Sequence, residues 1–319
     1  SRWEWDVPQP GTPGPWKLNY GFTGAAWQAD TVLAVQPGPE CTLTWATDAL
    51  IANRSGQDIR AQGLTLVAGS PNHDRDHYPQ ASYARVGAEM AMAAPMAPPA
   101  PTAEGEQYRY TLAGAADLPH GAIARVPLVR PTQAVACQRQ YVVGQPNRAG
   151  PPTRPWLAVQ GAGEQELPVQ WQLAIDNTAE AGLGMPLPAG RVRVTESGTW
   201  AGDARIEHTS VGTSLNLVLG QPFDLTAKRT VAAFNVDSDR LGASETVRVV
   251  LKNAKAADAT IQIHEAFPRW RGWELTASTV QPSQTHAQGA RFDVVVPANA
   301  EAVLEYTVHY RWPDLGPQG

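Results

Sequence analysis

Apolar and polar residues alternate along many short segments of this chain. Between residues 187 and 236, Arg191–Val194 alternates charged with apolar side chains, and Leu215–Leu219 forms a second apolar segment. Turn residues separate such segments, among them Ser197-Gly198 and Gly220-Gln221-Pro222. A period of two is typical of strands with one buried face. The stretch therefore predicts strand, turn, strand, turn, strand, and the residues after it repeat this scheme.

Regular strands are also predicted on both sides of this stretch. Residues 166–177 alternate most clearly, and residues 303–312 form a long alternating strand that we expect inside a sheet. No long helix and no sequence repeat is evident. The side chains expected to fill the interior of the C-terminal part are Phe234, Val247, Val249, Leu251, Ile261, Ile263, Phe292, Val294, Val296, Leu304, Tyr306 and Val308.

These patterns predict an all-β protein built from two antiparallel β-sandwich domains of the immunoglobulin-like kind. Residues 1–15 should form an extended Trp/Pro arm, because the prolines remove donors and fix φ. The expected N-terminal sandwich covers 16–181, the C-terminal sandwich 182–313, and a loose tail 314–319. Residues 70–105, rich in Pro, Ala and Met, should form a long excursion within the first sandwich, and loops of this length are usually functional or mobile.

Several segments of the sequence resemble one bacterial family, called mucoidy-inhibitor-A-like and also known as the domain of unknown function 4139. The similar segments come in the same order and extend over nearly the whole chain. They are Tyr20–Trp27, Asn53–Asp58, Leu187–Val194, Ile206–Thr209, Leu219-Gly220, Phe223–Arg229, Leu251–Lys255 and Tyr306–Trp312.

The resemblance implies a β-rich protein of the cell envelope, in the periplasm or at the cell surface, and it supplies no catalytic residues. Longer relatives carry a further N-terminal β domain and a helical coiled coil. Neither is visible here, so we expect a short member or a processed piece.

The composition narrows the choice of partners. The formal net charge is -5 and the sequence pI is about 5.8, whereas phosphate binding needs clustered Lys and Arg, so nucleic acid is not an expected partner. No run of about twenty apolar residues occurs, so no transmembrane helix is expected. Most of the 11 Trp should pack in the core, and stacking on carbohydrate or pigment is the alternative.

The two cysteines, Cys41 and Cys137, have two interpretations. They could be buried small apolar residues, or they could form one disulfide. The family resemblance implies export to an oxidising compartment, and for that reason we favour the disulfide.

One polar cluster could bind a metal ion. His73, Asp74, Asp76 and His77 lie within five residues, and such side chains bind Zn²⁺ or Cu²⁺ when a loop folds around the ion. A solvated polar loop without a ligand is the alternative. Nearby, three spaced thioethers could hold Cu(I), or they could simply belong to a linker. They are Met90, Met92 and Met96.

The remaining histidines and acidic residues point to structure rather than to chemistry. His208, His264 and His309 are expected to hydrogen-bond to the backbone. Asp237-Ser238-Asp239 is expected to form a surface turn, because it lacks the glycine and the distant glutamate of a calcium loop. No nucleophile elbow, phosphate loop or His-Glu-X-X-His motif is present.

We therefore expect an extracytoplasmic structural or interaction protein that binds another envelope component, such as an outer-membrane or surface-layer assembly. Trp3 and Trp5 of the arm, together with an exposed sheet edge, would make the contact. The alternative is a copper- or zinc-binding metalloenzyme, such as a superoxide dismutase, that uses His73 and His77. A module that binds carbohydrate or pigment through exposed Trp is the third hypothesis.

Overall fold

The computed structural model describes residues 18–38, 40–69, 99–144, 152–158 and 164–315, together with the backbone of 90–92. In this part of the chain the regular elements are strands, no α-helix occurs, and a short 3-10 turn, η2, spans Pro313–Leu315. No helix of the described residues has the length and apolar character needed to cross a bilayer. The prediction of an all-β protein is confirmed.

The N-terminal sheet contains six strands and is mixed. β1 pairs in parallel with β13, and β5 in parallel with β9, while the other pairs are antiparallel. In spatial order the strands are β14 (Thr199–Ile206), β13 (Gly190–Glu196), β1 (Ala25–Val35), β2 (Thr42–Asn53), β9 (Ile123–Ala136) and β5 (Met90–Met92).

Two small sheets cover one end of the N-terminal sheet. They share a core in which Leu66, Tyr110 and Leu112 pack with Ile51 and Val126. One sheet pairs β3 (Ile59–Ala61) with β8 (Ala116–Leu118), and the other has the order β4 (Leu64–Ala68), β7 (Gln107–Leu112) and β6 (Pro101–Glu104).

A connecting sheet contributes to two cores. Val169 of β12 belongs to the C-terminal core, whereas Leu173 and Ile175 of the same strand pack with β1, β2 and β13 in a middle core. β10 and β18 pair in parallel. The spatial order is β15 (Ser214–Gly220), β12 (Val169–Asp176), β10 (Gln138–Val143), β18 (Ala259–Ala266), β21 (Gly289–Val296) and β20 (Gln284–His286).

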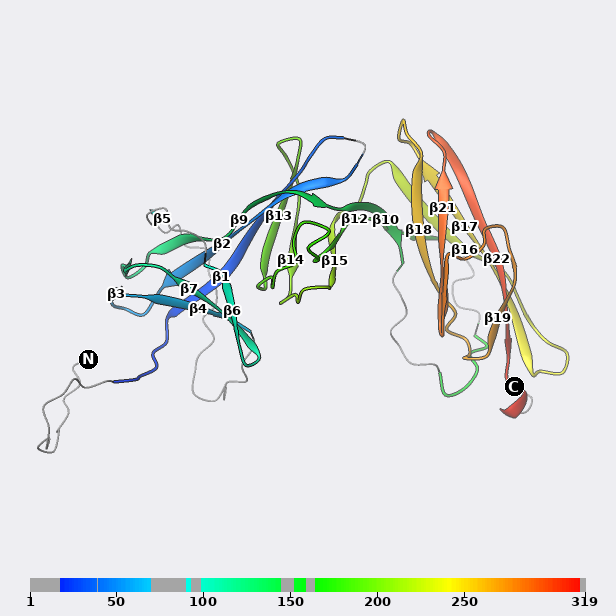
Figure 1. Ribbon diagram of the computed structural model, residues 1–319. Helices are drawn as coiled ribbons and strands as arrows, with labels where there is room; N and C mark the ends of the chain where they lie inside the picture. Colours follow the sequence, from blue (N-terminus) through cyan, green and yellow to red (C-terminus); the bar gives the residue numbers. More distant parts are fainter. Residues whose placement is uncertain are drawn as a thin grey trace, which may run out of the picture.

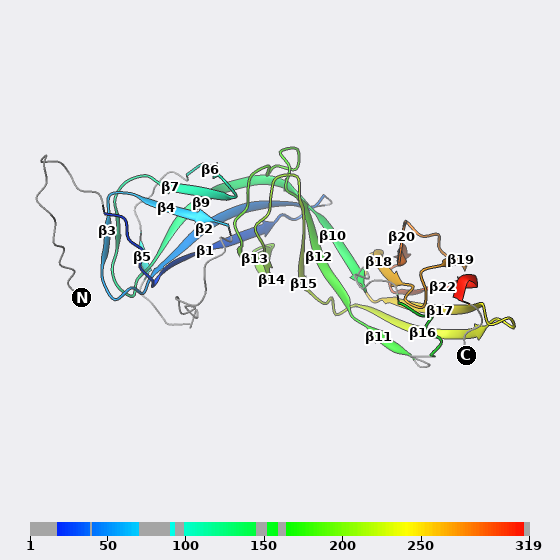
Figure 2. The same cartoon turned by 90° about the horizontal axis from the view of Figure 1, so that it is seen from below.

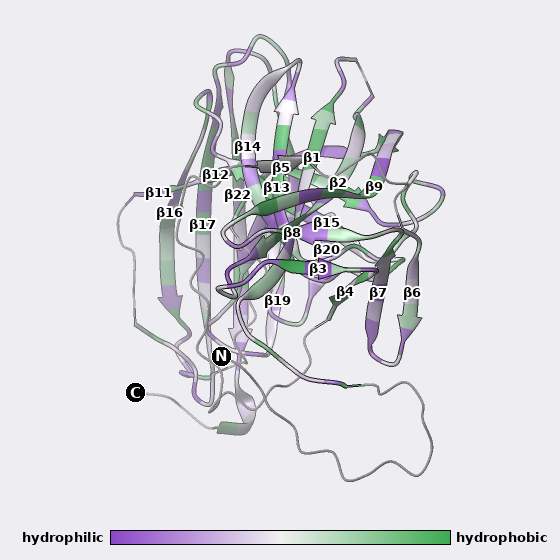
Figure 3. Ribbon diagram, turned by 90° about the vertical axis from the view of Figure 1, so that its left-hand side faces the viewer, coloured by the Kyte–Doolittle hydropathy of each residue, from purple (hydrophilic) through white to green (hydrophobic). Residues whose placement is uncertain are grey.

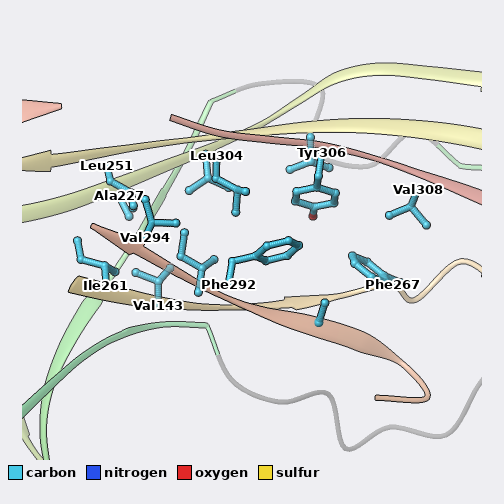
Figure 4. Close-up of a cluster of buried hydrophobic side chains, with 14 of the residues drawn as sticks. Val143, Ala227, Leu251, Ile261, Phe267, Phe292, Val294, Leu304, Tyr306 and Val308 are labelled. Carbon is cyan, nitrogen blue, oxygen red and sulfur yellow. The ribbon is translucent and has the colours of Figure 1, made fainter. Parts of the chain in front are cut away.

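The C-terminal sheet is antiparallel throughout and faces the connecting sheet. Its order is β11 (Gln165–Leu167), β16 (Leu225–Val236), β17 (Gly242–Asn253), β22 (Ala300–Arg311) and β19 (Trp273–Ser278). Figure 4 shows Leu304 and Tyr306 pointing from this sheet toward Phe292 and Val294 of the connecting sheet. The rings of Phe292 and Tyr306 stack with centroids 5.5 Å apart.

Alternating burial explains why these segments form strands. In β17 the side chains of Val247, Val249 and Leu251 are at most 1% exposed, and the residues between them face outward. Figure 3 shows this alternation as bands of hydrophobic and hydrophilic colour along β17. Of the twelve side chains predicted to fill the C-terminal core, all are buried except Phe234, which is half-buried at its margin.

The whole molecule is elongated. Figures 1 and 2 show two groups of strands side by side, with β10 and β12 running from one group to the other. The described chain begins at one end and finishes at the other. The division predicted at residue 182 stays a prediction. β13, which follows this position, pairs with β1, which precedes it, so the N-terminal sheet contains strands from both sides.

The expected antiparallel pairing is incomplete, and this is a correction. β1–β13, β5–β9 and β10–β18 are parallel pairs. Each of them joins segments that are far apart in the sequence, so no tight hairpin forces an antiparallel arrangement. The prediction that the last long strand lies inside a sheet is confirmed, since β22 pairs with both β17 and β19.

Candidate functional site

Most of the site residues predicted from the sequence lie outside the described part of the chain. This holds for Trp3 and Trp5 of the arm and for the whole predicted metal loop, whose residues are His73, Asp74, Asp76 and His77. These predictions stay predictions.

The methionine set lies only partly within the described residues. Met90 and Met92 belong to β5, whose backbone pairs with Ile123 and Arg125 of β9, and Met96 lies outside. In the described ranges, no group of three or more His, Cys, Asp or Glu side chains is arranged to hold a metal ion.

The predicted disulfide between Cys41 and Cys137 is present. Their Cα atoms are 5.0 Å apart, and the backbone N–H of Cys137 donates to the carbonyl of Cys41 at 2.9 Å. Both side chains are half-buried against the middle core. The bond ties the segment that enters β2 to the junction between β9 and β10.

The three histidines singled out in the sequence have different surroundings. His208 accepts a backbone hydrogen bond from Ala189 at 3.1 Å through Nδ1, as expected. Burial, followed by the nearby Arg291, lowers the pKa of His264. His309 instead lies 2.9 Å from the carboxylate of Asp237, so its partner is a side chain rather than the backbone.

The most exposed large apolar side chain of the described residues lies on the loop between β15 and β16. Phe223 is 97% exposed there. Next to it is a groove of about 380 Å³, lined by Leu167, Pro168, Pro222 and Leu225 as well as Phe223. An aromatic ring in water beside an apolar groove is the strongest candidate for a binding site in this structure.

Both walls of this groove are anchored to the fold. On one side, the carbonyl of Asp224 accepts a hydrogen bond at 2.8 Å from the N–H of Ala254, and Leu225 then begins β16 with only 3% exposure. On the other side, Leu167 pairs with Ala227. The turn that carries Phe223 is therefore held at Asp224 and Leu225, where β16 begins.

The rim of the groove is charged. Lys228 forms an exposed ion pair with Glu164 at 2.6 Å, and its hydrogen bond to Glu164 raises the pKa of Lys228. Glu166 also faces the groove. An apolar floor with a polar rim is typical of a protein-binding surface.

A second polar cluster lies on the outer face of the N-terminal sheet. Asp30, 4% exposed, accepts hydrogen bonds from Arg193 and, at 2.8 Å, from Arg125. Arg125 also donates to Asp48 at 2.6 Å. Burial opposes the charge on Arg125, but the hydrogen bonds to Asp48 and Asp30 raise its pKa. These pairs link β1, β2, β9 and β13, so they help to fix the register of the sheet.

Two ion pairs are buried in the C-terminal core. Glu265 accepts hydrogen bonds from Arg229 at 3.0 Å and from the hydroxyl of Tyr306 at 2.5 Å. Arg269 donates twice to Glu245, at 2.9 and 2.7 Å. Burial, followed by the charge of Glu265, raises the pKa of Tyr306. Since Glu265 and Glu245 are both paired and neither lines the groove, we assign these groups a structural role.

Sequence reasoning did not identify Phe223 as a site residue. Phe223 entered the sequence analysis only as the first residue of Phe223–Arg229, a segment that resembles the family. The signal was present nevertheless, because Phe223 directly follows the predicted turn Gly220-Gln221-Pro222, where apolar residues are not needed for the core. Only the structure shows that this ring stays exposed.

Comparison with known proteins gives a family but no characterised relative. The family model described as "Domain of unknown function (DUF4139)" matches residues 16–314. Neither a curated protein nor a solved structure matches this chain.

Proposed function

Since this chain belongs to the DUF4139 family, whose function is unknown, we propose from its own structure that it is an extracytoplasmic interaction protein. Its role would be to bind another component of the cell envelope. The observation that carries this proposal is the 97% exposure of Phe223 beside an apolar groove with a charged rim.

An exposed Phe is costly in a monomer. Burying such a side chain is worth about 1.5–3 kcal/mol, a gain that the free protein does not realise at Phe223. Binding energy at protein interfaces concentrates in aromatic anchors surrounded by a polar rim. The partner we propose is a protein segment that covers Phe223 and inserts an apolar side chain between Pro168 and Pro222.

The Cys41–Cys137 disulfide supports a location outside the cytoplasm. Disulfides persist in oxidising compartments and are rare where glutathione keeps thiols reduced. If the proposal is right, protein isolated from cells under thiol-blocking conditions contains no free thiol after denaturation. Two titratable thiols per chain would place it in a reducing compartment.

The proposal also includes a role for the N-terminal arm and a specific fold for the C-terminal part. The Trp3/Trp5 arm would add contacts to the same partner. The facing sheets around the C-terminal core would form an immunoglobulin-like sandwich, which is supported by β16, β17 and β22 packing opposite β18 and β21.

Covalent capture at a chosen position tests the proposal. A photo-crosslinking amino acid placed at position 223 of the full chain should give a cross-linked product with an envelope protein. The same group at Val295, which is 58% exposed on the connecting sheet, should give none. Phe223→Ala should weaken binding to the captured partner by about tenfold or more and leave the thermal midpoint unchanged.

Matched variants separate the groove from other surfaces. Trp200→Ala removes an exposed aromatic outside the groove and should leave binding of this partner intact, whereas deletion of residues 1–15 should weaken it. Recovery of only the free monomer, or equal binding by Phe223→Ala, would refute the proposal.

The metal hypothesis stays a prediction with its own test. Metal content per chain, measured before and after His73→Ala and His77→Ala, decides whether these residues bind copper or zinc. Less than a tenth of an equivalent of either metal would remove this hypothesis.

A further inference from the structure

An irregularity in β14 turns Trp200 toward solvent. Val194 of β13 pairs with Gly202, but the next residue, Thr195, pairs with Trp200, so Ala201 is an extra residue in the ladder. In a regular ladder, Trp200 would share the inner face with Gly202, which is two residues further along the strand. Instead Ala201 packs against the middle core, and Trp200 is 67% exposed. Bulges of this kind re-aim side chains and are frequent beside functional sites.

The exposure of Trp200 is exceptional among the tryptophans of the described residues. The others are buried or half-buried; they are Trp27, Trp45, Trp156, Trp171, Trp270, Trp273 and Trp312. On the same face, the carboxylate of Asp203 accepts a hydrogen bond from Arg191 at 2.7 Å. The hairpin therefore presents an exposed aromatic ring on the face that carries a charged pair.

The same face carries an excess of positive charge. Arg191 and Arg205 are direct cross-strand partners, and their two positive charges repel each other. Asp203 pairs with Arg191, and Arg193 pairs with Asp30. Arg205 is exposed and has no hydrogen-bond or ion-pair partner within the described ranges of the chain. On a chain with a net charge of -5, an uncompensated guanidinium on the same face as an exposed indole indicates an anionic ligand.

We propose that the outer face of the β13–β14 hairpin binds an acidic polysaccharide. Trp200 stacks on the apolar face of a sugar ring, and Arg205 binds a carboxylate of the same polysaccharide. Trp200 and Arg205 stand opposite Thr195 and Arg191, four residues apart on β13, which corresponds to about 13 Å along the strand. The site therefore fits an oligosaccharide rather than a single sugar.

Two features favour a glycan over a protein at this surface. Trp200 is the one large apolar side chain of the described hairpin that is exposed, so there is no apolar patch of the kind that surrounds an anchor in a protein interface. Its neighbours are planar charged groups, and Asp203 and Arg191 are already aligned by their ion pair, which suits the hydroxyl and carboxylate groups around a sugar ring. The site does not involve the Phe223 groove, so either proposal can fail without the other.

Isothermal titration of the full chain with short oligogalacturonates tests the site. A neutral cello-oligosaccharide of equal length and polyglutamate serve as the other probes. The chain should bind the oligogalacturonate, more weakly as NaCl is raised. Trp200→Ala should weaken this binding about tenfold, whereas Trp200→Phe, which keeps a ring, should lose less. Arg205→Gln should weaken binding of the acidic sugar about tenfold and leave binding of the neutral one unchanged.

The controls make the outcome decisive. Tyr20→Ala removes another exposed aromatic, 75% exposed, at the start of the described chain and should have no effect. Equal binding of polyglutamate would show that charge alone is recognised and would overturn the proposal. No binding of oligogalacturonate, or binding insensitive to both Trp200→Ala and Arg205→Gln, would overturn it as well.

Discussion

Buried asparagines hold the turns at the ends of three strands. Asn53, Asn177 and Asn253 are at most 1% exposed. Each side-chain amide donates to backbone carbonyls, and each side-chain oxygen accepts from backbone N–H groups of the following loop. An asparagine suits these positions because it is both a donor and an acceptor over a short reach.

Replacement of Asn253 by Ala should destabilise the protein by about 2–4 kcal/mol. Its amide donates to Ala257 at 2.9 Å, Val296 at 3.0 Å and Pro297 at 3.1 Å, and buried carbonyls that lose a donor cost about 1–3 kcal/mol each. Urea unfolding measures the change. Asn216→Ala on the exposed face of β15 is the control, expected within about 0.5 kcal/mol of wild type.

Tyr110 should make the protein less stable at high pH. Burial, followed by the neighbouring Tyr108, raises the pKa of Tyr110 to about 12, whereas an unfolded Tyr ionises near 10. Between these values the unfolded state loses a proton that the folded state keeps, so stability is intact below pH 10 and falls by up to about 2 kcal/mol as the pH approaches 12.

The variant Tyr110→Phe isolates this contribution. It removes the 3.3 Å hydrogen bond to the carbonyl of Pro186 and should cost about 1 kcal/mol at pH 8, but its stability should fall less steeply between pH 10 and 12. Urea midpoints at pH 8, 10 and 11.5 give both slopes. Parallel slopes for the two proteins would show that Tyr110 does not titrate as described.

At the scale of elements, one turn unit occurs twice. The carbonyl of Gly24 accepts from Arg54, and that of Asp224 accepts from Ala254. Asp58 accepts from the backbone N–H of His120, just as Asp258 accepts from that of Ala298. Both units join an antiparallel strand pair, β1–β2 and β16–β17, to the strand that follows the turn. The sequence shows no evident repeat because only a few polar and proline positions are shared.

The parallel contact between β1 and β13 depends on a glycine. A Cβ atom on Gly190 would overlap the carbonyl oxygen of Ala29, a backbone atom that cannot move aside alone. Gly190→Ala should therefore destabilise the protein by about 2–3 kcal/mol, as measured by urea unfolding. Gly63→Ala, where a Cβ meets nothing within 4 Å, should change stability by less than about 0.5 kcal/mol. Similar costs for both variants would argue against close β1–β13 packing.

At the scale of the whole molecule, the connecting sheet joins the two groups of strands. Val143 of β10 and Val169 of β12 are buried in the C-terminal core, although both precede the division predicted at residue 182. The C-terminal core is therefore incomplete without residues from before that position.

This arrangement predicts how fragments behave. A fragment of residues 182–319 should lack cooperative urea unfolding, because β18 loses its partner β10 and the core loses two valines. A fragment of residues 138–319 restores both strands and should unfold cooperatively. If the shorter fragment unfolds with the midpoint of the full chain, the predicted boundary marks an independent domain.

The class of the fold, the position of most strands and the inward-facing residues could all be inferred from the order of residues along the chain. Val247, Val249 and Leu251 are buried as expected, and β22 lies inside a sheet. These features could be predicted because alternation along a strand is a local property: each side chain faces the core or the solvent according to its own position. The Cys41–Cys137 bond was also expected, with the help of the family resemblance.

Which distant segments meet became clear only from the folded chain. The parallel pairs β1–β13 and β10–β18, the exposure of Phe223 and the turning of Trp200 by one extra residue all depend on contacts between segments far apart in the chain or on a local break in alternation. The free energy of such contacts arises only when the partners are brought together, so residue types and their spacing do not encode it locally.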